Sequence, residues 1–173
     1  MFNETFITET PTTDPKVLVG RNVGINVSDL LRQPSKYYMK LIFKINKIDD
    51  AQKRAYTRFN GYSVSKEHVY RVVRKRIQKV EAVTYVETKD KWKLQVSTVT
   101  ILNRNTESEI QRKIRKHVED SLIENVAGLS IDDFVKLVIN SVLQVKIKKS
   151  GTKIYPVRFS EIIKIEVMNA PAD

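Results

Sequence analysis

Cationic side chains gather in three short blocks of this sequence, and no block contains an acidic residue. The blocks consist of Arg71, Arg74, Lys75, Arg76 and Lys79; of Arg112, Lys113, Arg115 and Lys116; and of Lys146, Lys148, Lys149 and Lys153. Packing like charges together does not stabilise a fold, so a polyanionic partner is the simplest reason for such blocks. One basic run is often only a solvated helix face, but three in one small protein favour a binding surface. Nucleic acid is the commonest partner of this kind.

Catalytic groups show no comparable pattern. The two histidines, His68 and His117, are far apart in the sequence, and neither has the spacing of a zinc site. The acidic pairs Asp49-Asp50 and Asp132-Asp133 fit a turn and a helix start. The chain has only five glycines, which is too few for us to expect a glycine-rich, phosphate-binding loop. We therefore expect no enzyme and no cofactor, although acids that converge only in space could still form a metal-dependent nuclease.

Composition limits the remaining classes of protein. The chain has 173 residues, a formal net charge of +11, 41% hydrophobic residues and no cysteine. This size suits one domain with a substantial core. The lack of cysteine excludes disulfide scaffolds and thiolate metal sites. No apolar run approaches the roughly 20 residues that cross a bilayer, and the acidic, Thr-rich start is not a signal peptide. We expect a cytoplasmic protein with no membrane partner.

The elements that position these blocks can be predicted from hydrophobic periodicity. Residues 1–16 lack it and are expected to form an irregular arm, residues 17–168 a single α+β RNA-binding domain, and residues 169–173 a frayed end. Alternation predicts strands around 23–27, 39–45, 55–59, 82–88, 92–102 and 157–167. The segment 89–91 should be the turn of a hairpin.

Helical spacing predicts two basic, amphipathic helices and a third, shorter helix. The first would begin after Ser65 as N-cap and continue to Val80. The second would follow a capping box made by Thr106 and Glu109, with the second basic block opposite its apolar stripe. Ser130 should cap the third helix, and residues 141–153 fit either a helix or a strand. Together, these elements predict an antiparallel β-sheet that curls into a barrel with flanking amphipathic helices.

Several short motifs, in order along the chain, resemble the archaeal and eukaryotic small-subunit ribosomal protein family S3Ae, also called eS1. They cover nearly the whole chain, from about Val17 to Val167. The motifs are Leu18-Val19-Gly20-Arg21, Ser28-Asp29-Leu30, Pro34-Ser35-Lys36, Tyr56-Thr57-Arg58-Phe59-Asn60-Gly61, Val72-Val73-Arg74-Lys75-Arg76, Thr88-Lys89-Asp90, Ile114-Arg115-Lys116 and Lys153-Ile154-Tyr155-Pro156-Val157-Arg158.

The resemblance implies a structural ribosomal protein of the archaeal kind, with a β-barrel and flanking helices. Its expected partners are small-subunit rRNA, neighbouring ribosomal proteins and messenger RNA near its exit from the subunit. Combined with the charge pattern, it predicts that rRNA phosphates contact Lys36, Arg71, Arg74, Lys75, Arg76, Arg104, Arg112, Lys113, Arg115, Lys116, Lys148, Lys149 and Lys153.

Three departures from the family pattern are visible, one of which is that residues 143–151 are less helical in character than the family's corresponding Ala- and Lys-rich segment. The sequence opens at Met1-Phe2 without the family's usual basic N-terminal stretch, and we expect one rRNA contact surface to be absent with it. At the hairpin tip the family often has Asp-Gly, whereas Lys91 follows Asp90 here. A type I′ turn, which favours glycine at that point, is therefore not expected. The alternative functions are an RNA-binding or RNA-chaperone module outside the ribosome and, ranked below it, the nuclease.

Overall fold

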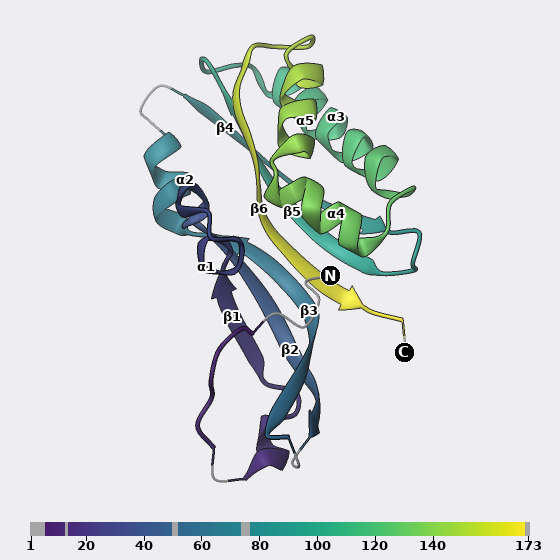
Figure 1. The fold of residues 1–173 in the computed structure, drawn as a ribbon. Coiled ribbons are helices and arrows are strands. Elements are labelled where there is room, and N and C mark those ends of the chain that lie inside the picture. The colour runs from purple at the N-terminus through teal and green to yellow at the C-terminus, as the bar shows by residue number, and fades with distance from the viewer. Residues whose placement is uncertain (1–5, 13, 50–51, 74–76, 172–173) are drawn as a thin grey trace. The chain divides into compact units, whose positions relative to one another are not determined.

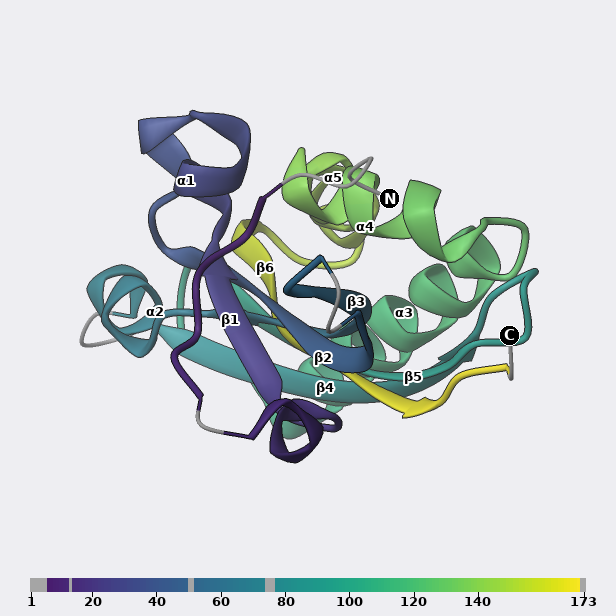
Figure 2. The same cartoon turned by 60° about the horizontal axis from the view of Figure 1, so that its bottom comes forward.

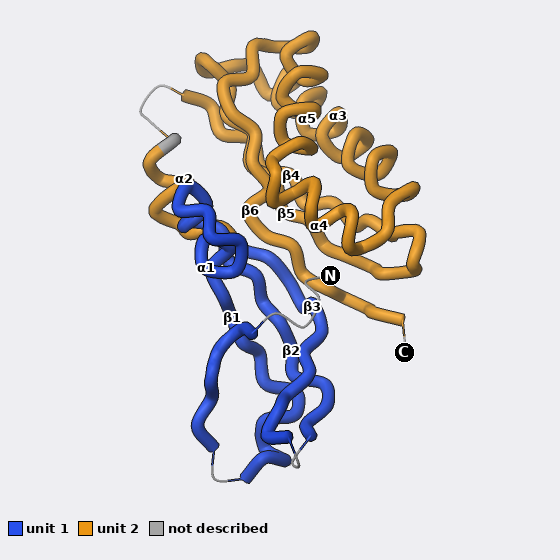
Figure 3. The backbone as a smooth tube through the Cα atoms, in the orientation of Figure 1, with its two compact units in different colours: residues 1–63 blue, residues 64–173 orange. Residues whose placement is uncertain are grey.

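Residues 6–12, 14–49, 52–73 and 77–171 are described by the computed structural model. The chain divides into two units, residues 1–63 and residues 64–173 (Figure 3). Each unit combines strands with helices, which confirms the predicted α+β class.

Unit 1 is built on three strands. They are β1 (Asn22–Asn26), β2 (Met39–Asp49) and β3 (Arg54–Val64), whose last residue enters unit 2. β2 lies between the other two, and β1 pairs with it in antiparallel register. Met39, Leu41, Phe43 and Ile45 alternate along β2 and are all buried, as the sequence pattern predicted. Short helices connect these strands: the 3₁₀ helices η1 (Pro15–Leu18) and η2 (Pro34–Lys36), and α1 (Val27–Leu31).

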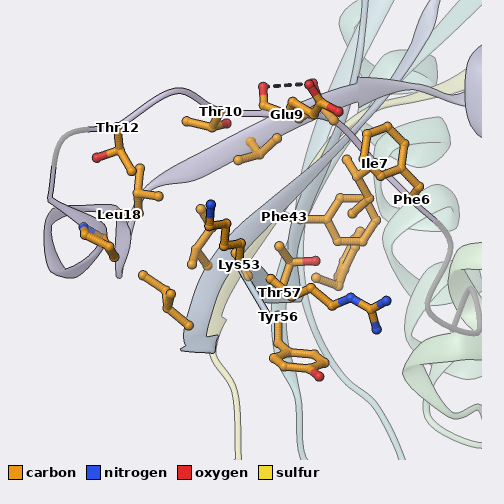
Figure 4. Close-up of a pocket in the computed structure, with 18 of the residues that line it drawn as sticks. Phe6, Ile7, Glu9, Thr10, Thr12, Leu18, Phe43, Lys53, Tyr56 and Thr57 are labelled. Carbon is orange, nitrogen blue, oxygen red and sulfur yellow. Dashed lines mark hydrogen bonds between the residues drawn. The ribbon is translucent and has the colours of Figure 1, made fainter. Parts of the chain in front are cut away.

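The N-terminal arm of unit 1 borders a groove of about 1400 Å³. Figure 4 shows Phe6 and Ile7 of the arm beside Phe43 of β2, with Tyr56 of β3 on the same groove. Phe43 meets Phe59 edge to face, with ring centroids 6.3 Å apart. The groove is lined mainly by apolar and threonine side chains, and none of the predicted RNA-binding residues contributes to it.

Unit 2 contains three antiparallel strands in the order β6-β5-β4. They are β4 (Gln78–Glu87), β5 (Lys93–Leu102) and β6 (Val157–Asn169). β4 and β5 form the predicted hairpin, in which Thr88 N–H donates to the Trp92 carbonyl over 3.0 Å. In the turn Lys91 has φ +59°, and it is the only residue there with positive φ. Since a type I′ turn needs two such residues, the turn is of another type, as expected.

The helices of unit 2 are α2 (Lys66–Val72), α3 (Ser108–Val126), α4 (Ile131–Ile139) and α5 (Val142–Gly151). α3, α4 and α5 gather on one side of the strands (Figures 1 and 2), where α3 contacts β4 and α5 contacts β6. The predicted stripe of α3 is confirmed, because Ile114, Val118 and Leu122 are buried. The predicted cap of α4 is also confirmed: Asp133 N–H donates to Ser130 Oγ over 3.3 Å.

Three expectations need correction. The first basic helix does not reach Val80 but ends at Val72, and β4 begins at Gln78. Pairing with β5, which sets Gln78 opposite Leu102, takes the last residues of that segment, from Gln78 to Val80, into the sheet. The second helix begins at Ser108, and its N-cap is Glu107 rather than Thr106.

The barrel is not confirmed either. Within the described residues of each unit, the first and last strands of the order do not pair with each other, so no ring of strands forms. A barrel requires that closing pair. The ambiguous segment 141–153 is largely helical, because Leu143 and Ile147 of α5 are both buried.

Candidate nucleic-acid interface

α3 presents its cations on three sides. Its buried stripe, Ile114, Val118, Leu122 and Val126, follows helical spacing. Arg112 and Lys116, one turn apart, lie opposite that stripe and are exposed.

The other two cations of the block lie on the flanks of the helix. Arg115 lies on the flank near β4, where its Nε donates to the Glu81 carbonyl over 2.9 Å. Lys113 is on the opposite flank.

That opposite flank faces α5, and two contacts fix how the helices pair. His117 Nε2 lies 2.9 Å from Ser150 Oγ near the end of α5. Lys146 Nζ, nearer the start of α5, donates to Asn125 Oδ1 near the end of α3. As numbering rises along α3 it therefore falls along α5, and the two helices are antiparallel. The middle of α3, at His117, therefore lies beside the last turn of α5, and the basic residues that precede His117 lie toward that end of α5.

The third basic block sits at that last turn of α5. Lys148 and Lys149 belong to the turn and Lys153 follows it, and all three are exposed. Cations at a helix C-terminus are stabilised by the helix dipole. The positions of Lys148 and Lys149 in the last turn of α5 therefore also have a structural explanation. The same reason does not apply to α3, whose basic residues occupy its first half, before Glu119, Asp120 and Glu124.

The loop before α3 reaches the same end of unit 2. Asn103 N–H donates to the Pro156 carbonyl over 3.2 Å, which ties this loop to the segment after α5. Arg104 is therefore next to the chain that carries Lys153, and it is exposed. We call this region the basic end; it comprises Arg104, Arg112, Lys113, Arg115, Lys116, Lys148, Lys149 and Lys153.

Most cations of the basic end are not used inside the protein. Among the described residues, six side-chain cations have no hydrogen-bond or ion-pair partner: those of Arg104, Arg112, Lys116, Lys148, Lys149 and Lys153. The exceptions are Arg115, held at β4, and Lys113, whose Nζ lies 2.6 Å from Glu109 Oε1. The hydrogen bond and charge of Lys113 lower the pKa of Glu109. The region thus carries six exposed cationic side chains that no group of the described chain neutralises, and such side chains are suited to phosphate oxygens.

Comparison with known proteins agrees with the sequence motifs. The chain matches the Ribosomal S3Ae family over residues 1–171. It is 34% identical to the small ribosomal subunit protein eS1 of Methanobrevibacter smithii over 97% of this chain and 86% of that protein. It is also 34% identical to the eS1 protein of Methanothermobacter thermautotrophicus, over 99% of this chain and 87% of that protein. The chain belongs to the ribosomal S3Ae family.

The basic end does not include the remaining predicted residues of this S3Ae family member. Arg74, Lys75 and Arg76 lie outside the described residues. Arg71 is exposed at the end of α2, and burial, with a smaller effect from Arg71, lowers the pKa of His68. Lys36 is half-buried and belongs to unit 1.

One S3Ae residue at the basic end was missed by sequence reasoning. Arg158 is exposed at the start of β6, directly after Val157, which pairs with Leu102. It lies in the stretch 134–160, which contains no carboxylate, and that is the signal that could have found it.

Two features are absent from the described residues. No group of three or more His, Cys, Asp or Glu side chains there could hold a metal ion. In that same part of the chain, no helix is long and apolar enough to cross a membrane.

Proposed function

We propose that this protein is a structural constituent of the small ribosomal subunit and binds ribosomal RNA through its basic end. Membership of the S3Ae family and relatives named small ribosomal subunit protein eS1 support the ribosomal role. The observation that carries the RNA site is the antiparallel packing of α3 and α5. It joins basic blocks that are separate in the sequence, and most of these cations have no partner in the described chain.

Binding would be dominated by backbone phosphates. Arg104 and Arg112 can each bridge two phosphate oxygens, whereas the lysines act as point charges. Arg115 ties α3 to β4, whereas Lys113 pairs with Glu109 within the same helix, and both add positive potential. Contacts of this kind fix position on the RNA more than they read its sequence.

The wider proposal follows from the family. Residues 17–168 would act as one RNA-binding domain, in contact with neighbouring ribosomal proteins and with messenger RNA near its exit. The protein would be cytoplasmic and ribosome-associated, and it would work without a cofactor or catalysis.

Salt dependence tests the RNA site directly. A variant with Arg112→Ala, Lys116→Ala and Lys149→Ala loses three unpaired cations of the basic end. Its control, with Lys89→Ala, Lys93→Ala and Lys136→Ala, loses the same charge elsewhere in unit 2. Binding to small-subunit rRNA is measured by filter retention at several salt concentrations. The log–log slope should fall by roughly 0.7 per lost phosphate contact, about 2 in total, and stay near wild type in the control. Equal slopes in the two variants would remove the basic end from the RNA site.

Sedimentation tests the ribosomal role. The full chain should co-migrate with the small subunit on sucrose gradients at moderate and at high salt. If it stays at the top while the subunits remain intact, the ribosomal assignment is wrong. Broad binding to single-stranded RNA would then favour the module outside the ribosome.

A further inference from the structure

Gln144, a buried side chain near the start of α5, joins three elements of unit 2. It is only 3% exposed. Its Nε2 donates to the Val138 carbonyl of α4 over 3.0 Å and to Glu161 Oε1 of β6 over 3.5 Å. Only an N–H group can face a carbonyl, so the bond to Val138 fixes the orientation of the amide. The two N–H groups of Gln144 therefore link α5 to α4 and to β6.

The amide oxygen of the same side chain has no donor. Gln144 Oε1 is buried, and no group among the described residues donates to it. A buried acceptor without a donor costs free energy. The carboxyl of Glu161 already accepts from Nε2 of this amide. If that carboxyl carries a proton, its O–H can supply the missing donor, and acid and amide then share two hydrogen bonds.

The surroundings of Glu161 favour the protonated acid. Glu161 is 5% exposed, and it stands opposite Val99 of β5, which is 2% exposed. The hydroxyl groups nearby in the sheet are used elsewhere: Thr98 Oγ1 donates to the backbone of β4, and Thr100 Oγ1 lies 3.4 Å from Ser160 Oγ. A neutral carboxyl suits such a setting better than a carboxylate does.

No charge offsets this preference within the described chain. Burial raises the pKa of Glu161 to about 7, and the hydrogen bond from Gln144 opposes only part of that change. No charged side chain contributes to the shift. This holds even for Lys148, one turn beyond Gln144 on α5, and for Arg158 on β6, both of which are exposed.

Other charged groups of the surrounding elements have partners of their own. Lys146 of α5 donates to α3, Lys136 of α4 pairs within its helix, and Lys164 of β6 pairs within its strand. His68 of α2 lies near β6, with its ring centroid 6.3 Å from that of Phe159. Burial lowers the pKa of His68, which favours its neutral form. Among the described residues, no ion pair therefore competes with the proton on the buried carboxyl.

The link between Gln144 and Glu161 also bears on the basic end. Gln144 lies in the first turn of α5, and Lys148 and Lys149 lie in the last turn of the same helix. α5 contacts β6 on one side and α3 on another (Figure 1). A short helix moves as one piece, so the way in which its first turn is held affects where its last turn places the two lysines.

We propose that Glu161 is a positioning residue of the RNA site, whose protonated carboxyl donates to Gln144 Oε1 and so holds α5 against β6. Loss of the proton removes this donor and sets a carboxylate beside an unsatisfied amide oxygen. α5 then loosens, and Lys148 and Lys149 lose their fixed place beside α3. The effect on RNA rests on the proposed function of the basic end.

The pH profile of RNA binding tests this inference. Binding of the full chain to small-subunit rRNA is measured by filter retention between pH 6 and pH 8.5 at constant salt. The affinity of the wild type should fall about threefold or more over this range, because ionisation of the carboxyl favours the loosened form. Glu161→Gln should lose this dependence and keep the higher affinity, since its amide also donates to Gln144 Oε1 and carries no charge.

Glu166→Gln is the matched control, because it removes an exposed carboxylate from the same strand. It should keep the wild-type profile. Any contribution of His68 or His117 is the same in all three proteins, so the difference between the profiles isolates Glu161. A flat wild-type profile, or equal profiles for Glu161→Gln and the wild type, would overturn the proposal.

Nuclear magnetic resonance of the unsubstituted protein decides the question if Glu161→Gln does not fold. The carboxyl carbon of Glu161 must titrate near pH 7. The amides of α5, corrected for their intrinsic rates, must lose protection over the same pH range, while those of β5 keep it. Unchanged protection of α5 rejects the proposal. This measurement needs no RNA, whereas the salt slopes of the basic-end variants report the RNA site, so the two proposals can fail independently.

Discussion

The two ends of unit 2 handle charge in opposite ways. At the hairpin end, two carboxylates are used by the fold. Asp90 Oδ2 accepts from Ile131 N–H over 3.1 Å, and Asp133 Oδ2 accepts from Ser130 Oγ over 2.9 Å. At the basic end, Arg112, Lys116 and Lys149 have no partner in the described chain. The comparison shows that the fold uses these two carboxylates at the hairpin end, whereas most cations of the basic end stay unpaired within the described chain.

The largest expected effect separates stability from binding at the basic end. Ile114 is fully buried beneath the turn of α3 that carries Arg112 and Lys116. Ile114→Ala should lower the free energy of unfolding by about 3 kcal/mol, because it removes buried methyl groups and leaves a cavity. The slope of RNA binding against salt should not change, since no cation is lost. Urea unfolding and filter retention measure the two quantities.

Ile123→Ala is the matched control for that variant. This isoleucine lies on the same helix but is 49% exposed, so its loss should cost much less. If the two substitutions destabilise equally, the assignment of the faces of α3 is wrong.

A second prediction concerns a charge that the fold buries. Burial raises the pKa of Glu161 from 4.5 to about 7, and a hydrogen bond from Gln144 opposes this only in part. Below pH 4.5 the carboxyl is neutral in both the folded and unfolded states, so its contribution to stability is complete. Between pH 4.5 and 7 the unfolded state ionises first and stability falls; above pH 7 the loss is constant. Glu161→Gln should abolish this fall and be more stable by about 2–3 kcal/mol at pH 8.

Urea unfolding at pH 4 and pH 8 checks this prediction. Glu166→Gln on the same strand is the control. The Glu166 side chain is partly exposed, and its Oε1 lies 2.6 Å from Lys164 Nζ. A pH 8 gain that is no larger for Glu161→Gln than for the control would show that Glu161 is not a buried acid.

A third prediction compares one charge from each end. Asp90→Ala should cost about 1 kcal/mol of stability, since it leaves the first N–H of α4 without its acceptor. Arg112→Ala should leave the unfolding free energy within about 0.5 kcal/mol, because Arg112 has no partner in the described chain. Thermal unfolding of both variants measures the contrast. The reverse order would contradict the distinction between the two ends.

The smallest effect concerns the backbone at the hairpin end. Lys91 has φ +59°, a conformation that glycine adopts without steric cost. Lys91→Gly should therefore raise stability by about 0.5 kcal/mol, as relief of the steric cost exceeds the entropy that glycine loses. Lys89→Gly, at a position without positive φ, should destabilise instead. A loss of stability for both would mean that the turn is not strained at Lys91.

Much of the fold could be predicted from the sequence because its pattern is local. The alternation of Met39, Leu41 and Phe43 and the stripe of Ile114 and Val118 each have one consistent period. The errors lie where pairing between segments that are distant in the sequence determines the secondary structure. The apolar residues within 73–80 have helical spacing, yet Gln78 pairs with Leu102 and is the first residue of strand β4. Closure of a barrel is likewise a matter of distant pairing that no local period encodes.

The candidate site divides in the same manner. The basic blocks could be recognised from the sequence alone, because the residues of each block lie close together along the chain. Their meeting could not, since it depends on the contacts of His117 with Ser150 and of Lys146 with Asn125. Sequence also could not separate Arg115, which bonds to the backbone of β4, from its neighbour Lys116.

The antiparallel contact of α3 and α5 also sets an order in time. During synthesis, Arg112 and Lys116 leave the translating ribosome well before Lys149 and Lys153. Until α5 emerges and packs, the cations remain spread along a chain without fixed geometry, and only weak, non-specific contacts with RNA are available to them. Under the proposed function, tight RNA binding is a property of the finished molecule, and an incomplete or misfolded copy would lack the surface with which it enters an assembling particle.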